Sequence, residues 1–154
     1  MNRSWCVLIL IMILLFSTTC SAPNLSTIDE EININTHRLH IRCLGRGSTT
    51  VVIDTGMGET IENWDPIMTT LSEESRVCGY DRAGYGQSDM GPLTRDAQRA
   101  ADELNLLLTS AGEIGPFLLV GHSLSGLNMQ VFANSYPDEI IGLVLLYPSP
   151  IAWM

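Results

Sequence analysis

The sequence predicts an α/β domain built on a mostly parallel sheet, with an antiparallel N-terminal hairpin and flanking helices on both faces. Three observations predict this class. Two early segments alternate apolar and polar residues, which is typical of half-buried strands. Short, nearly continuous apolar runs follow, as expected for parallel strands covered on both sides. Between those runs lie stretches whose apolar residues recur at helical spacing, so each run is expected to join the next by a right-handed crossover.

The chain has 154 residues, a formal net charge of −9 and a pI near 4.5. This acidic balance argues against nucleic acid and against anionic membrane surfaces as partners. The strand–helix alternation belongs to a fold that usually needs roughly 200–250 residues. We therefore expect a partial domain, truncated after the strand that ends near Leu146.

Residues 1–22 have the composition of a targeting segment rather than of a folded domain. Arg3 precedes an uncharged apolar run over residues 5–16, and small or polar residues follow it. This order is typical of a secretory signal peptide. As a helix the run would rise about 18 Å, which is shorter than the roughly 30 Å hydrocarbon core of a bilayer. Two alternatives stay open: an uncleaved N-terminal anchor that associates with the membrane through residues 5–16, and a lipoprotein modified on Cys20. In each case the protein is exported, as a secreted or a membrane-anchored form.

Residues 23–27 are expected to be a linker, and residues 28–154 the partial domain. Alternation over residues 28–34 and 38–44 predicts the antiparallel hairpin. His37 and His40 lie on this hairpin and are interpreted as surface residues. A short apolar strand at residues 51–53 then runs into a glycine-punctuated loop that contains Gly56 and Gly58.

The middle of the chain supplies two helices and a strand. Asn63 and Pro66 indicate the start of a helix that runs to about Glu74. The segment 76–80 is the next strand, and a polar loop over residues 81–88 follows it. Behind Thr94, seven apolar residues at helical spacing predict one long amphipathic helix: Ala97, Ala100, Ala101, Leu104, Leu107, Leu108 and Ala111.

The stretch over residues 121–126 reads Gly-His-Ser-Leu-Ser-Gly, and it lies between an apolar strand at residues 117–120 and a helix-compatible segment. A strand, a sharp turn carrying a serine and a helix form the context of a nucleophile elbow. There the strained turn exposes the hydroxyl of Ser123 and aims the backbone N–H of Leu124 at a developing oxyanion. The usual pattern has glycine at position 125, and serine is small enough to replace it. An accidental Gly/Ser-rich loop is the alternative.

Three segments together resemble the α/β-hydrolase family: the elbow at 121–124, the loop at 81–88, and the glycine loop at Gly56 with Trp64 beyond it. They occur in the family's order, and the likeness covers about residues 28–154. The resemblance implies that Ser123 is the nucleophile and that the amides of Leu124 and Met57 form the oxyanion hole. Six residues would support the elbow and the loop: Gly121, His122, Ser125, Gly126, Gly56 and Gly58. His122 is interpreted as structural rather than catalytic, and Asp81 and Arg82 as braces of their loop.

The family's sheet order also places the second strand beside the fourth, running in the opposite direction. This arrangement would bring Cys43 near Cys78. The two residues could then form a disulfide or remain as two buried free thiols.

In this family the acid and the histidine follow the serine along the chain. No histidine occurs after His122 here, so we expect a serine hydrolase that is weakly active or inactive alone, with a small-molecule ester or amide as its substrate class. The strand at 140–146 would be an apolar edge prone to self-association. The alternatives are a non-catalytic exported binding scaffold and an incomplete sequence of a full-length active hydrolase. No metal site and no cofactor is predicted.

Overall fold

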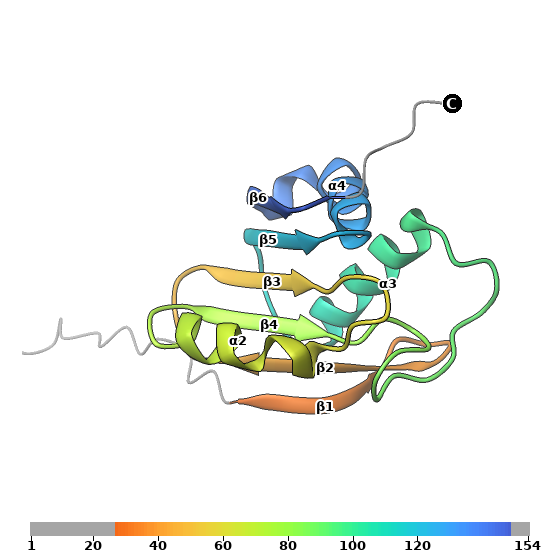
Figure 1. The fold of residues 1–154 in the computed structure, drawn as a ribbon, viewed down its shortest axis with the longest axis horizontal. Helices are drawn as coiled ribbons and strands as arrows, with labels where there is room; N and C mark the ends of the chain where they lie inside the picture. Colours follow the sequence, from red (N-terminus) through yellow and green to blue (C-terminus); the bar gives the residue numbers. More distant parts are fainter. Residues whose placement is uncertain (1–26, 149–154) are drawn as a thin grey trace, which may run out of the picture.

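The computed structural model describes residues 27–148, which form one mixed sheet with helices on both faces (Figure 1). The strands in chain order are β1 (Ile28–Asn33), β2 (Arg38–Leu44), β3 (Thr50–Asp54), β4 (Arg76–Tyr80), β5 (Phe117–His122) and β6 (Ile140–Leu146). Their order across the sheet is β1-β2-β4-β3-β5-β6. The pairs β1–β2 and β2–β4 are antiparallel and the other three are parallel, which confirms the predicted fold class. The predicted leader, with Cys20, and most of the predicted linker lie outside the described residues.

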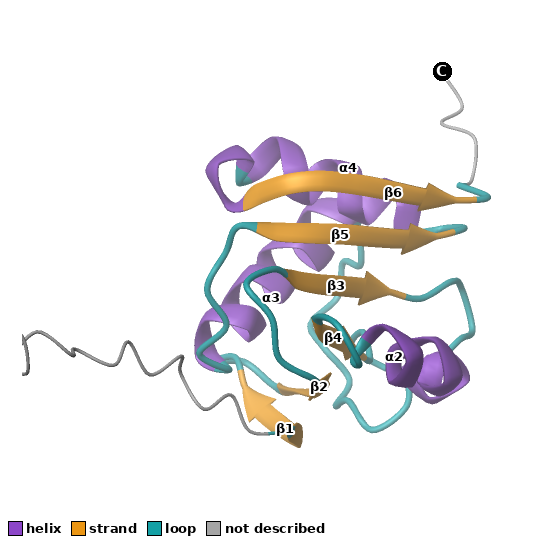
Figure 2. Ribbon diagram, turned by 90° about the vertical axis from the view of Figure 1, so that its left-hand side faces the viewer, coloured by secondary structure: helices purple, strands orange, loops and turns teal. Residues whose placement is uncertain are grey.

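The helices cover the two faces unequally. The short 3₁₀ helix η1 (Ile61–Trp64) continues into α2 (Asp65–Leu71) on one face, and α3 (Ala97–Ser110) and α4 (Ser125–Ser135) lie on the other (Figure 2). A last short turn, η2 (Pro137–Glu139), leads into β6. Over residues 27–148, no helix combines the length and the apolar character needed to cross a bilayer.

The apolar core is divided by the sheet into two clusters. The larger one lies under α3 and α4 and includes Leu104, Leu107 and Phe132, all essentially inaccessible to solvent. The smaller one lies under η1 and α2 and is centred on Ile61 and Met68. Each such side chain contributes about 1.5–3 kcal/mol relative to its exposed state, so α3 and α4 are held mainly by their apolar faces.

Polar side chains cap η1 and α3, and the start of η1 differs from the sequence prediction. In η1 the Asn63 side chain accepts a hydrogen bond from the Thr60 amide at 2.9 Å, so Asn63 closes a capping box instead of preceding the helix. In α3 the cap is Asp96, whose carboxylate accepts from the Arg99 amide at 2.8 Å. The helix α2 also ends earlier than expected, at Leu71.

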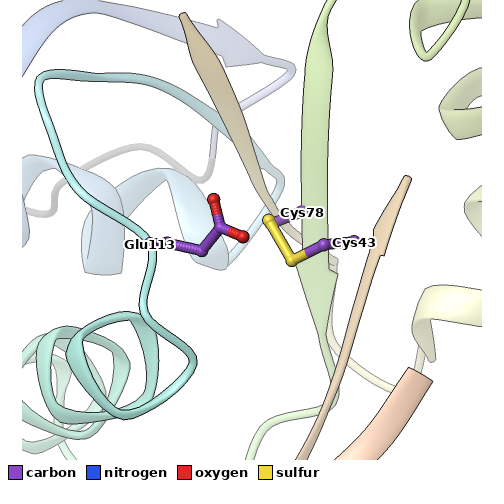
Figure 3. A group of neighbouring side chains, drawn as sticks. All are labelled: Cys43, Cys78 and Glu113. Carbon is purple, nitrogen blue, oxygen red and sulfur yellow. A yellow bond between two sulfur atoms is a disulfide. The ribbon is translucent and has the colours of Figure 1, made fainter. Parts of the chain in front are cut away.

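Cys43 and Cys78 are joined by a disulfide in the structure. They are directly opposite each other in the antiparallel β2–β4 ladder, their Cα atoms are 4.1 Å apart, and both side chains are buried. Glu113 lies beside the two sulfur atoms (Figure 3), but its carboxylate accepts a hydrogen bond from Arg76 at 2.6 Å. Because the sulfurs are bonded to each other, this group has no thiolate to offer a metal ion.

The prediction that His37 and His40 are surface residues is wrong, since they are only 8% and 3% exposed. The imidazole of His40 lies between two carboxylates: Nδ1 is 3.0 Å from Asp81 Oδ2, and Nε2 is 2.8 Å from Asp29 Oδ1. Asp81 also accepts from the amide of Ile61 at 2.9 Å. His40 therefore ties β1 and β2 to the loop that follows β4. Both of its buried ring nitrogens have a carboxylate as partner, which offsets the cost of burying them.

We expect the stability of the chain to fall as pH rises above about 6.5. The hydrogen bond to Asp81 is the largest cause that raises the pKa of His40. A raised pKa stabilises the folded state fully below the unfolded value, and that contribution is lost as pH rises through the folded one. The deprotonated ring can donate through only one nitrogen, so one carboxylate loses its bond. Urea unfolding of the wild type and of His40→Gln between pH 5 and 9 tests this. A constant difference between the two proteins across that range would contradict it.

Candidate active site

The turn between β5 and α4 has the backbone of an elbow. Strand β5 ends at His122 and α4 begins at Ser125, so only Ser123 and Leu124 lie between them. Ser123 has φ of +54°, in the left-handed region that residues other than glycine rarely adopt. Its amide donates to the carbonyl of Leu146 at 3.0 Å, which fastens the turn to the end of β6. Strain of this kind is found at functional sites where the surrounding structure enforces it.

Small residues allow strand and helix to meet beneath that turn. A Cβ atom at Gly121 would lie 2.9 Å from the carbonyl oxygen of Ser125 and 3.0 Å from the Cα of Gly126. Backbone atoms cannot move away as a flexible side chain can, so Gly121 is required for this packing.

A second loop approaches the elbow from β3. It contains Gly56 and Met57, and the Met57 side chain is 69% exposed. Within residues 27–148, neither the Met57 amide nor the Leu124 amide donates to another group of the chain. Both donors are therefore without an acceptor among the described residues, and both follow strands, β3 and β5, that end side by side at the carboxyl edge of the sheet.

The strand–elbow–helix geometry agrees with the comparisons with known proteins. A family model described as alpha/beta hydrolase fold matches residues 49–154. The chain belongs to the α/β-hydrolase fold family. It is 35% identical over 105 residues to the Bacillus subtilis protein YqjL, covering 68% of this chain and 42% of that protein. It is 30% identical over 106 residues to the bovine (lyso)-N-acylphosphatidylethanolamine lipase, covering 67% of this chain and 31% of the lipase.

Solved structures of α/β-hydrolases superpose well on this one. Cfl2 from Burkholderia cenocepacia gives a TM-score of 0.75 at 29% identity, over 86% of this chain and 47% of Cfl2. E-2-(acetamidomethylene)succinate hydrolase gives 0.68 at 26% identity, over 77% of this chain and 43% of that enzyme. This α/β-hydrolase chain thus spans less than half the length of these relatives.

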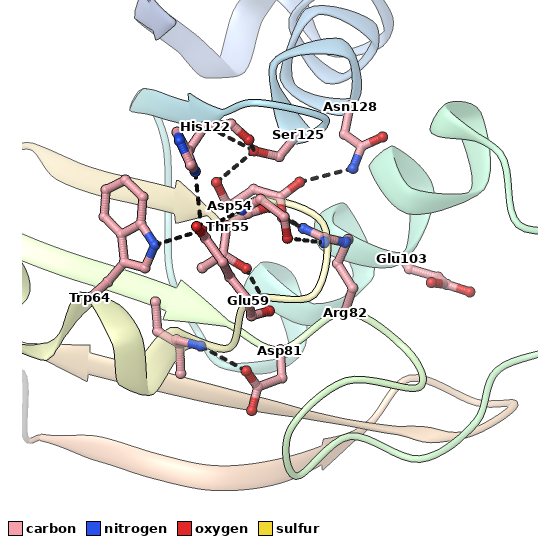
Figure 4. Close-up of polar contacts among 12 residues, drawn as sticks. Asp54, Thr55, Glu59, Trp64, Asp81, Arg82, Glu103, His122, Ser125 and Asn128 are labelled. Atoms are coloured by element: carbon pink, nitrogen blue, oxygen red, sulfur yellow. Dashed lines mark hydrogen bonds and ion pairs between the residues drawn. The ribbon is translucent and has the colours of Figure 1, made fainter. Parts of the chain in front are cut away.

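Ser125 does more in this α/β-hydrolase than fill the place of a glycine. Its buried hydroxyl lies 2.7 Å from the Asp54 carbonyl and 2.8 Å from the His122 carbonyl, and it accepts from the His122 amide at 2.7 Å (Figure 4). Since a hydroxyl has a single proton, it donates to one of the two carbonyls at a time. Ser125 therefore connects the elbow to the end of β3, a link that glycine could not make.

Beneath the loop after β3 lies a buried ionic cluster. Asp54 is inaccessible to solvent; its carboxylate pairs with Arg82 and accepts from the Asn128 side chain at 3.0 Å. Burial raises the pKa of the Asp54 carboxyl, and the positive charge of Arg82 opposes that rise. Arg82 also donates to the carbonyls of Thr55 and Gly56, the latter at 2.7 Å. One guanidinium thus sets the path of the loop that leads to Met57.

Glu59 belongs to the site although no sequence pattern indicated it. Its Oε2 accepts from the Gly56 amide at 2.8 Å and from Trp64 Nε1 at 3.2 Å, and it lies 3.1 Å from Nδ1 of His122. The Trp64 ring packs against His122 with their centroids 5.7 Å apart. His122 therefore faces Glu59 and Trp64. Asp54 and Asn128 were also missed, because their roles depend on contacts between residues more than 25 positions apart.

Proposed function

We propose that this protein is an exported serine hydrolase that cleaves carboxylic esters or related acyl and amide bonds through Ser123. The observation that carries the proposal is the left-handed backbone of Ser123, on a two-residue turn between β5 and α4. A serine held in that conformation presents its hydroxyl above the sheet edge. Two relatives, a lipase and a hydrolase of E-2-(acetamidomethylene)succinate, support the class of bond.

In the proposed reaction the Ser123 oxygen attacks the acyl carbon, and the leaving group departs with a proton to give an acyl-enzyme. The amides of Leu124 and Met57 would bind the oxyanion, and each such donor typically contributes about 2.7–4 kcal/mol to the transition state. The step needs a base that takes the serine proton. Within residues 27–148 no imidazole is hydrogen-bonded to the Ser123 hydroxyl. We therefore propose that this chain alone turns over slowly.

Hydrolysis of p-nitrophenyl acetate by the purified chain tests the function. We expect slow turnover through Ser123 that exceeds the residual of roughly 10³–10⁴-fold over the uncatalysed reaction, which binding and oxyanion stabilisation give without the nucleophile. Ser123→Ala should lower the rate to that residual. Ser110→Ala, which removes an exposed hydroxyl at the end of α3, is the matched control and should change nothing. Equal rates for the wild type and Ser123→Ala would refute the proposed nucleophile.

Export is part of the proposal. It is supported by the composition of residues 1–22 and by the Cys43–Cys78 disulfide, because disulfides persist mainly in oxidising compartments.

A non-catalytic role as an exported binding scaffold is the second candidate, and the edge of the sheet favours it. In the described part of the chain β6 pairs only with β5. Three of its side chains are open to solvent: Ile141 at 55%, Val144 at 40% and Leu146 at 37%. An exposed apolar edge strand is a template for pairing with another chain, including a second copy. Ester hydrolysis that does not depend on Ser123 would favour this candidate over the hydrolase.

A further inference from the structure

The loop after β3 and the elbow after β5 meet through a single carboxylate oxygen. Oε2 of Glu59 is within 3.2 Å of three nitrogens, which belong to Gly56, Trp64 and His122 (Figure 4). Gly56 directly precedes Met57, and His122 directly precedes Ser123. One side chain thus spans the two segments that carry the proposed oxyanion donors.

The space around this oxygen is shaped for the contact. A Cβ atom at Gly56 would lie 2.9 Å from Nδ1 of His122 and 3.1 Å from Oε2 of Glu59. The imidazole and the carboxylate therefore occupy the volume that any side chain at position 56 would need. Trp64 is buried, with 8% of its surface exposed. Its indole therefore donates to the carboxylate from a fixed position.

The chemistry of the contact determines the state of His122. An ionised carboxylate only accepts hydrogen bonds, so Nδ1 of His122 must carry a hydrogen. The hydrogen bonds from Gly56 and Trp64 favour the ionised carboxylate: burial raises the pKa of Glu59, but these bonds and His122 outweigh it and leave the pKa below its ordinary value. At neutral pH the carboxylate is charged, and charge-assisted bonds of this kind are the stronger ones.

We propose that Glu59 is a positioning residue that holds the Met57 loop against the Ser123 elbow, so that the two amides face one oxyanion. The inference rests on the proposed function, and it assigns the alignment of the two oxyanion donors to one side chain. Glu59 contacts no reacting atom. It acts through Gly56 on one side and through His122 on the other.

The test compares Glu59→Gln with Glu62→Gln in the full chain. Glu62 is exposed and lies three residues further along the chain. Its change therefore removes the same charge without touching the contacts of the Glu59 carboxylate. The acylation rate constant and KM are measured with p-nitrophenyl butyrate, after subtraction of the Ser123→Ala rate. We expect Glu59→Gln to acylate about 10- to 100-fold more slowly with KM little changed, because misplacement by about 1 Å costs that much. Glu62→Gln should match the wild type.

The outcomes separate the two proposals. Glu59→Gln at the wild-type rate, with Ser123→Ala clearly slower than both, would overturn the positioning role and leave the nucleophile standing. Equal rates for the wild type and Ser123→Ala would overturn the proposed function and this inference with it. Nitrogen NMR of His122 in the wild type gives an answer even if Glu59→Gln does not fold. A hydrogen on Nδ1 supports the hydrogen bond from His122 to Glu59, and a neutral ring with its hydrogen on Nε2 alone would refute the positioning role.

Discussion

Replacement of Arg82 by methionine is expected to lower the free energy of unfolding by about 3–5 kcal/mol, because removing one partner of a buried ion pair leaves the other charge uncompensated. The stranded partner is Asp54, which is completely buried and keeps the Asn128 amide as a neutral donor. The substitution also removes the hydrogen bonds that Arg82 donates to the carbonyls of Thr55 and Gly56, so it loosens the loop that carries Met57. Urea denaturation at pH 7 measures the change.

The double variant Arg82→Met/Asp54→Asn is the matched control. It removes both charges, so it should recover a large part of the stability that the single variant loses. A single variant within about 0.5 kcal/mol of the wild type, the range of an ordinary surface change, would show that the pair does not hold the loop.

Reduction of the Cys43–Cys78 disulfide is expected to destabilise the chain by about 4 kcal/mol. The bond joins residues 35 positions apart, and the chain-entropy model assigns about that much to closing a loop of this length in the unfolded state. Urea unfolding of the same protein with and without a thiol reductant measures the effect while keeping both sulfur atoms in place.

The variant Cys43→Ala/Cys78→Ala provides the control, since the reductant should leave its unfolding midpoint unchanged. Any shift in that variant would come from other cysteines and would be subtracted. Identical midpoints for the oxidised and reduced wild type would mean that the bond is absent or contributes nothing to stability.

The strands could be predicted well because their signal is local. The β6 strand at Ile140–Leu146 and the β4 strand at Arg76–Tyr80 coincide with the predicted segments. The sheet buries β4 completely, whereas Ile141, Val144 and Leu146 of β6 stay exposed. The order of the strands came from the family resemblance, which brought Cys43 opposite Cys78. The choice between a disulfide and free thiols was not available from the sequence, because it depends on the separation of the two residues in space.

The errors concern polar residues whose partners are distant in sequence. His40 alternates with Leu39 and Ile41, so the pattern placed it on a solvated face. The loop after β4 covers that face and brings Asp81 to the ring from 41 residues away. Glu59 was missed for the same reason: its contact with His122 crosses 63 residues. Periodicity reports which face is apolar, and it does not report which loop will cover the other face.

The central claim is that the elbow makes Ser123 a nucleophile. Reaction of the full chain with a fluorophosphonate, followed by mass spectrometry of its peptides, tests this most directly, because the adduct marks the attacking hydroxyl itself and needs no turnover. We predict one adduct per chain, on Ser123, that is absent from Ser123→Ala and that forms slowly because no imidazole contacts this hydroxyl within residues 27–148. An unmodified Ser123 after prolonged reaction, or an adduct that persists in Ser123→Ala, would contradict the account.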